Sequence, residues 1–202
     1  MFEKIKNIVA SFVEQYNRLK ATFDSEVARI KATYIEGNSQ FVNEMRIAKD
    51  TFEHGVQAIR ESSLAQVNTV IQEMNSALEK MVVADVEHPN YSTELELLRN
   101  ADLTQYEVDA YLKKYSHSYL ASKIMKEIAE SKGLETDRVM TVNDFKKMIQ
   151  ETFDDCQTLF NKYQGNDPMK QIYSCQCIIH GDKFDRFEKQ SKTFLQLVEG
   201  EK

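Results

Sequence analysis

The chain has 202 residues and a formal net charge of −6 at pH 7, with 42% hydrophobic and 29% charged residues. Six glycines and two prolines are too few to punctuate a fold built from many strands, so the composition predicts an all-helical protein. The acidic balance argues against a general attraction to nucleic acid. The longest runs without Asp, Glu, Lys or Arg, residues 62–72 and 171–181, are too short to cross a bilayer, so no membrane partner is expected.

The N-terminal residues and the cysteines both bear on the compartment. Glu3, Lys4 and Lys6 lie within what would be a secretory leader, and Glu14 and Arg18 soon interrupt the apolar residues that follow, so the segment does not match such a leader. Three cysteines, an odd number, fit a reducing compartment better than a disulfide scaffold. We therefore expect a cytoplasmic protein.

One apolar stripe at helical spacing runs through residues 1–83. From Phe2 to Ile59 the apolar residues recur in steps of three or four, with one gap of seven across Gly37. If that gap is counted as two steps, the average is about 3.56 residues per step, between the periods of a left-handed supercoil and a straight helix. This register continues across Gly37 and favours one long amphipathic, coiled-coil-like helix. A C-terminal cap at Gly37, followed by an N-cap at Asn38 or Ser39, would instead give a helical hairpin.

A stripe of this length needs a partner, because it is larger than the apolar patches that soluble monomers leave exposed. The partner is either a second copy or another part of the same chain. We predict that residues 1–83 are a self-association element. The predicted interface between copies consists of large apolar residues of the stripe, namely Phe12, Leu19, Phe23, Ile30, Phe41 and Phe52.

Beyond residue 83 the sequence predicts a linker and then shorter helices. Pro89 disfavours helical geometry at His88, and residues 84–104 are expected to form a linker with a short helix over 93–100. Residues 105–202 are expected to form a small C-terminal helical bundle.

Several helix ends in this bundle are marked by capping residues. Thr104 and Glu107 have the spacing of a capping box. A helix is expected over residues 116–133, where Ser116 is the N-cap and Gly133 the C-terminal cap.

A third helix is expected to begin at Thr141 to Asp144 and to continue to Gly165. Pro168 then suits the first turn of a last helix, which is expected to reach about Val198.

The stretch YSCQCIIHG, residues 173–181, holds two of the three cysteines and one histidine. Together with Cys156 it makes a Cys3His set of the kind that suits zinc. In a helix Cys175 and Cys177 would point about 200° apart, which leaves Cys156, Cys177 and His180 as the candidate ligands. Because free cysteines commonly pack as small apolar residues, we favour core packing and expect no metal and no cofactor.

Catalytic and nucleic-acid motifs are absent from the sequence. There is no phosphate loop, GxGxxG, GxSxG or HExxH motif, so we predict that the protein is not an enzyme. Residues 104–133 have the length of a helix-turn-helix, but acidic residues nearly balance their lysines and they contain no arginine to read guanine. A packed pair of helices is the prediction, and nucleic acid is not an expected partner.

Residues 100–134 carry a helical pattern that resembles a known class of proteins. Its elements are Leu103-Thr104, Glu107 and Asp109, Lys113-Lys114-Tyr115, and Ile128-Ala129-Glu130 with Gly133-Leu134. The segment resembles helical segments in structural and assembly proteins of tailed phages of Gram-positive bacteria. The resemblance covers about a sixth of the chain, carries no catalytic residues, and implies a scaffold, virion or host-interaction role.

These observations lead to one main prediction and two alternatives. The main prediction is a non-enzymatic, phage-encoded helical protein that acts through self-association in virion or capsid assembly, in the host cytoplasm or the virion. The first alternative is a phage-encoded module that inhibits a host macromolecule such as a defence nuclease. The second is a small metal-binding helical protein. Expected partners are further copies of the chain and another phage or host protein.

Overall fold

The computed structural model describes residues 1–87, 92–165, 184–185, 188–189 and 192. The helices of this part are α1 (Phe2–Thr33), α2 (Ser39–Glu87), α3 (Ser92–Asn100), α4 (Gln105–Lys114), α5 (Tyr119–Ser131) and α6 (Val142–Lys162). These residues contain no strand, which confirms the all-α prediction. The last predicted helix, over residues 167–198, lies largely outside the described residues.

None of the helices in the described ranges combines the length and the apolar character that a membrane-spanning helix requires.

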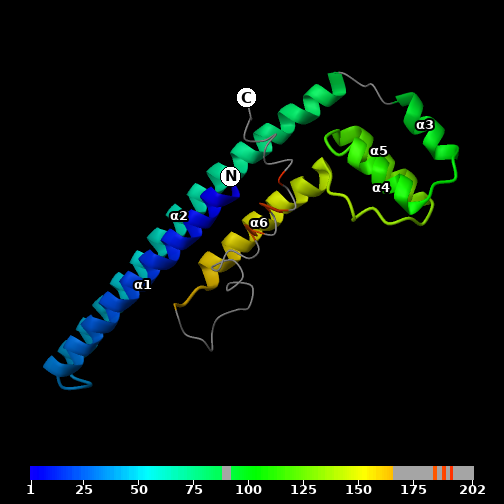
Figure 1. The fold of residues 1–202 in the computed structure, drawn as a ribbon. Helices are drawn as coiled ribbons and strands as arrows, with labels where there is room; N and C mark the ends of the chain where they lie inside the picture. Colours follow the sequence, from blue (N-terminus) through cyan, green and yellow to red (C-terminus); the bar gives the residue numbers. More distant parts are fainter. Residues whose placement is uncertain (88–91, 166–183, 186–187, 190–191, 193–202) are drawn as a thin grey trace. The chain divides into compact units, whose positions relative to one another are not determined.

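Helices α1 and α2 form an antiparallel hairpin (Figure 1). At the turn Gly37 has a φ of 84°, a backbone conformation that favours glycine. Asn38 Oδ1 accepts a hydrogen bond from the Phe41 amide at 2.6 Å, which is the bond that an N-cap makes. The continuous helix that the register favoured is therefore wrong. Apolar spacing is the same on both sides of the turn, so the turn residues decide the outcome and the periodicity does not.

The chain forms two compact units that each combine distant segments. Unit 2 consists of Phe2–Thr69 and Phe153–Phe184, and unit 1 consists of Met1, Val70–Thr152 and Asp185–Lys202. Helices α2 and α6 each contribute residues to both units. This grouping cuts across the division into residues 1–83, 84–104 and 105–202 that we expected.

Aromatic rings from α1 and from the end of α6 form the centre of unit 2. Phe12 of α1 lies 4.5 Å from Phe160 of α6 between ring centroids, and Tyr16 lies 5.0 Å from Tyr163. Such tilted and edge-on ring pairs add to the free energy gained by burial. The end of α6 therefore covers part of the apolar stripe of α1.

Unit 1 has an aliphatic core between short helices. Its buried members come from α3, α4, α5 and the segment after α5, namely Leu95, Leu98, Val108, Leu112, Tyr115, Ala121, Met125, Ile128, Ala129 and Val139. Contacts of α5 with α3 and α4 dominate this cluster. Burial of this many apolar side chains is the main force that holds such short helices together.

The helix ends in unit 1 largely follow the predicted caps. Thr104 and Glu107 form the complete capping box of α4, and Gly133 has a φ of 71° just after α5. Helix α5 begins later than predicted, because Ser118 rather than Ser116 accepts the bond from the Ala121 amide. These bonds satisfy amides that have no partner inside the helix.

Candidate functional site

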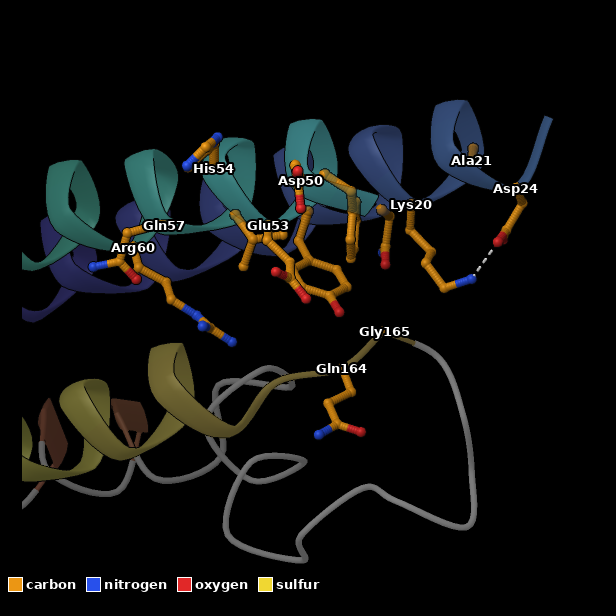
Figure 2. A pocket seen from close by; sticks show the side chains of 14 residues that line it. Lys20, Ala21, Asp24, Asp50, Glu53, His54, Gln57, Arg60, Gln164 and Gly165 are labelled. Carbon is orange, nitrogen blue, oxygen red and sulfur yellow. Dashed lines mark hydrogen bonds and ion pairs between the residues drawn. The ribbon is translucent and has the colours of Figure 1, made fainter. Parts of the chain in front are cut away.

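A polar groove lies on unit 2 beside the hairpin, where α6 ends (Figure 2). We call it the polar groove; its lining residues are Tyr16, Asn17, Lys20, Ala21, Asp24, Asp50, Phe52, Glu53, His54, Val56, Gln57, Arg60, Gln164 and Gly165. Its volume of about 1410 Å³ exceeds the roughly 300–1,000 Å³ of a small-molecule pocket. The size suits a protein segment better than a small substrate.

Several charged side chains of the polar groove are held in ion pairs along their own helix. Lys20 pairs with Asp24 in α1, a contact drawn in Figure 2. In α2, Asp50 pairs with Arg46 at 3.1 Å. Exposed pairs of this kind contribute little to stability. The groove therefore has an aromatic floor, from rings such as Tyr16, and walls of largely neutralised charge.

Arg60 has a different role, because it ties the hairpin to the end of α6. Its Nε donates to the Phe160 carbonyl at 2.7 Å and its Nη2 donates to the Asn161 carbonyl at 3.2 Å. These carbonyls lie in the last turn of α6, where the positive charge of Arg60 also interacts favourably with the negative end of the helix dipole. Arg60 is thus a structural clamp of unit 2.

Burial controls the titration of the tyrosines next to this groove. Desolvation by burial raises the pKa of Tyr16 and also that of Tyr163. The Tyr163 hydroxyl donates to Asn17 Oδ1 at 3.3 Å. Both hydroxyls therefore stay protonated at neutral pH and act as hydrogen-bonding groups, not as bases.

The six predicted interface residues lie on the hairpin, and most of them pack within the chain. Phe12 and Ile30 are fully buried, and Phe23 stacks on Phe52 with centroids 4.9 Å apart.

Leu19 and Phe41 complete the set of six. Leu19 packs closely against Gly55, because a Cβ added at Gly55 would lie 3.2 Å from the Leu19 side chain. Phe41 is half-buried. An interface between copies built from these six residues stays a prediction, and it requires the hairpin to open.

The predicted metal set is only partly within the described residues. Cys177 and His180 lie outside them, and Cys156 is a buried free cysteine. Burial raises the pKa of the Cys156 thiol to about 12, so it stays protonated at neutral pH and behaves as a small apolar side chain. Within the described ranges, no group of three or more His, Cys, Asp or Glu residues is placed to hold a metal ion.

A second groove lies on unit 1 and has an apolar floor. We call it the apolar groove; it is lined by Asn75, Leu78, Glu79, Val82, Val83, Tyr119, Val142, Asn143, Lys146, Lys147 and Gln150. Leu78 and Val142 are buried, whereas Val83 is 56% exposed. An apolar floor with a charged rim is the arrangement of a protein interface.

Polar contacts between α5 and the start of α6 hold one wall of the apolar groove. Asn143 Nδ2 donates to the Tyr119 carbonyl at 3.2 Å and to Ser122 Oγ at 3.1 Å. Lys126 Nζ lies 2.6 Å from both carboxylate oxygens of Asp144, and its side chain is only 16% exposed. A wall fixed in this way is preformed for binding.

The sequence interpretation missed both grooves. The grooves combine residues from two or three helices that are far apart in the chain, and no local motif connects them. One signal was present: Met81, Val82 and Val83 are three consecutive apolar residues, more than one helix face can bury.

Comparison with known proteins identifies no relative, because no family model matches the chain and no curated protein or solved structure is significantly similar to it.

Proposed function

We propose that the protein is a non-enzymatic structural or assembly component that acts by binding protein chains, including its own copies. The observation that carries this proposal is the apolar groove. It has a volume of about 970 Å³, a partly exposed apolar floor and two lysines on its rim. Grooves between helices commonly bind a helix or a turn of a partner through such a floor.

The polar groove supports the same view of the molecule. Its charged side chains stabilise the hairpin and the end of α6 through ion pairs and through Arg60. Side chains engaged in such contacts stabilise the fold of unit 2. The setting that we propose, virion or capsid assembly in a tailed phage, rests on the resemblance of residues 100–134.

Sedimentation velocity of the full chain tests the proposal. We expect association that grows with protein concentration from about 1 to 100 µM, because assembly follows mass action. A sedimentation coefficient that corresponds to a monomer over this whole range would contradict it. A circular dichroism melt at each concentration serves as the control, since a folded sample is needed for either conclusion.

A further inference from the structure

The tip of the hairpin exposes large apolar side chains that the turn does not need. We define the hairpin tip as residues 34–36 and 41–42. Ile35 is 80% exposed and Val42 is 56% exposed. The turn itself is made by the positive φ of Gly37 and the Asn38 cap, so neither apolar side chain is required for its geometry.

The apolar groove of unit 1 is the matching surface. Its floor includes the buried Leu78 and Val142 and the exposed Val83. Two aliphatic side chains presented on a turn can be covered by such a floor, because apolar surface removed from water is stabilising at about 25 cal/mol per Å².

The charges around the two surfaces are also complementary. Glu36 directly follows Ile35 and is exposed, and Lys146 and Lys147 are exposed on the rim of the groove. A second pair of opposite sign is available between Lys31, in the last turn of α1, and Glu79 on the rim. Opposite charges around an apolar centre orient two partners and disfavour other pairings.

The occupant that matches both the apolar floor and the charges of the rim is the hairpin tip of a second copy. A tip from another copy also supplies the contact that the proposed self-association requires.

We propose that the hairpin tip of one copy docks into the apolar groove of the next. The inference rests on the proposed self-association and adds its two surfaces. One such contact leaves one copy with a free tip and the other with a free groove. If this second pair closes reciprocally the assembly is a two-fold dimer, and if it accepts further copies the assembly is a ring or an open-ended chain.

Two single variants and their mixture test this pairing by sedimentation velocity. Ile35→Asp disables the tip, and Val83→Asp disables the groove. Each variant alone should be monomeric, because a charge at the centre of a small interface weakens binding tenfold or more, roughly the loss of 1.4 kcal/mol. The mixture should form dimers and nothing larger, because Val83→Asp still has its tip and Ile35→Asp still has its groove.

The controls separate this inference from folding and from the proposed function. Leu97 of α3 is 69% exposed outside both surfaces, so Leu97→Asp should assemble like the unchanged protein. Circular dichroism melts should be similar for all variants, since each site is exposed. If the unchanged protein assembles and Ile35→Asp or Val83→Asp assembles equally well, the tip-to-groove contact is wrong while self-association stands. A mixture that stays monomeric overturns the pairing, and a monomeric unchanged protein overturns both proposals.

Discussion

The contacts that stabilise unit 2 join residues farther apart in the sequence than the contacts that stabilise unit 1. In unit 2 the decisive contacts join α1 and α2 to the end of α6, and Arg60 and Phe160 are 100 residues apart. In unit 1 the polar contacts join neighbours, such as Glu94 with Lys114, 20 residues apart. Local sequence signals therefore describe unit 1 well, whereas unit 2 depends on pairings that no local pattern contains.

Deleting a buried ring should give the largest effect and should show whether the units unfold separately. Phe12→Ala removes the ring that contacts Phe160 and should lower the free energy of unfolding by about 3–5 kcal/mol. Leu112→Ala, at a fully buried site of unit 1, should cost about 2–5 kcal/mol. Urea titrations followed by circular dichroism measure both losses.

Hydrogen exchange then localises each loss. We expect Phe12→Ala to speed exchange in α1 and in the end of α6, and Leu112→Ala to speed it in α3, α4 and α5. Identical exchange patterns for the two variants would mean that the units unfold as one. The units would then differ in the range of their contacts but not in their stability.

Removing the Arg60 clamp should have the next largest effect. Arg60→Ala deletes the hydrogen bonds to Phe160 and Asn161 and should cost about 1.5–3 kcal/mol, the range for bonds that involve a charged group. Gln57→Ala, one turn earlier on the exposed face of α2, is the matched control and should stay within about 0.5 kcal/mol. Equal losses for the two variants in urea titrations would show that Arg60 does not clamp α6.

Two of the glycines that follow helix ends, one in each unit, offer a matched pair. Gly37 in unit 2 and Gly133 in unit 1 both have positive φ, and a Cβ added at either would meet no atom within 4 Å. Replacement of either by Ala should cost about 1 kcal/mol through backbone strain alone. Asn at the same positions should cost less, because Asn tolerates this conformation. Thermal melts of the four variants test this, and a neutral Gly37→Ala would count against the tight hairpin turn.

The smallest expected effect concerns Glu94 and its pH dependence. Hydrogen bonds from Lys114, first, and from Tyr115 lower the pKa of Glu94. A carboxyl whose pKa is lower in the folded state than in the unfolded state stabilises the fold at any pH above the unfolded-state pKa, near 4.5. This stabilisation is lost as the pH falls through the folded-state pKa. Because Glu94 is partly exposed, the contribution should stay below about 1 kcal/mol.

The variant Glu94→Gln isolates this contribution. Its unfolding free energy should be lower than that of the unchanged protein at pH 7. In parallel urea titrations the difference should shrink as the pH falls below 4.5 and vanish once the pH lies below the folded pKa of Glu94. A difference that persists unchanged at low pH would assign the effect to packing.

Much of unit 1 could be predicted because its signals are local. The capping box of Thr104 and Glu107 and the cap at Gly133 are confirmed by the structure. Asp144 accepts hydrogen bonds from the amide and the hydroxyl of Thr141, both at 2.8 Å, so the predicted start of α6 is confirmed too. Such bonds connect residues three positions apart, and the spacing of residue types is enough to indicate them.

The grooves could not be predicted in the same way. The clamp of Arg60 requires knowledge of where α6 ends against the hairpin, and the apolar groove requires α2, α5 and α6 together. A charged residue within a helix is normally solvated, so the sequence around Arg60 carries no sign of its role. Core packing, favoured over zinc binding for Cys156, Cys177 and His180, stays a prediction, because Cys177 and His180 lie outside the described residues.

The all-helical class, most helix ends and the long apolar stripe can be read from the sequence, because propensity, capping and periodicity act over a few residues. What covers the stripe depends on contacts between residues far apart in the chain. A spacing near 3.5 is equally compatible with a coiled coil between copies and with a hairpin inside one chain. The choice depends on the turn at Gly37 and on rings such as Phe12 and Phe160 that meet across the fold.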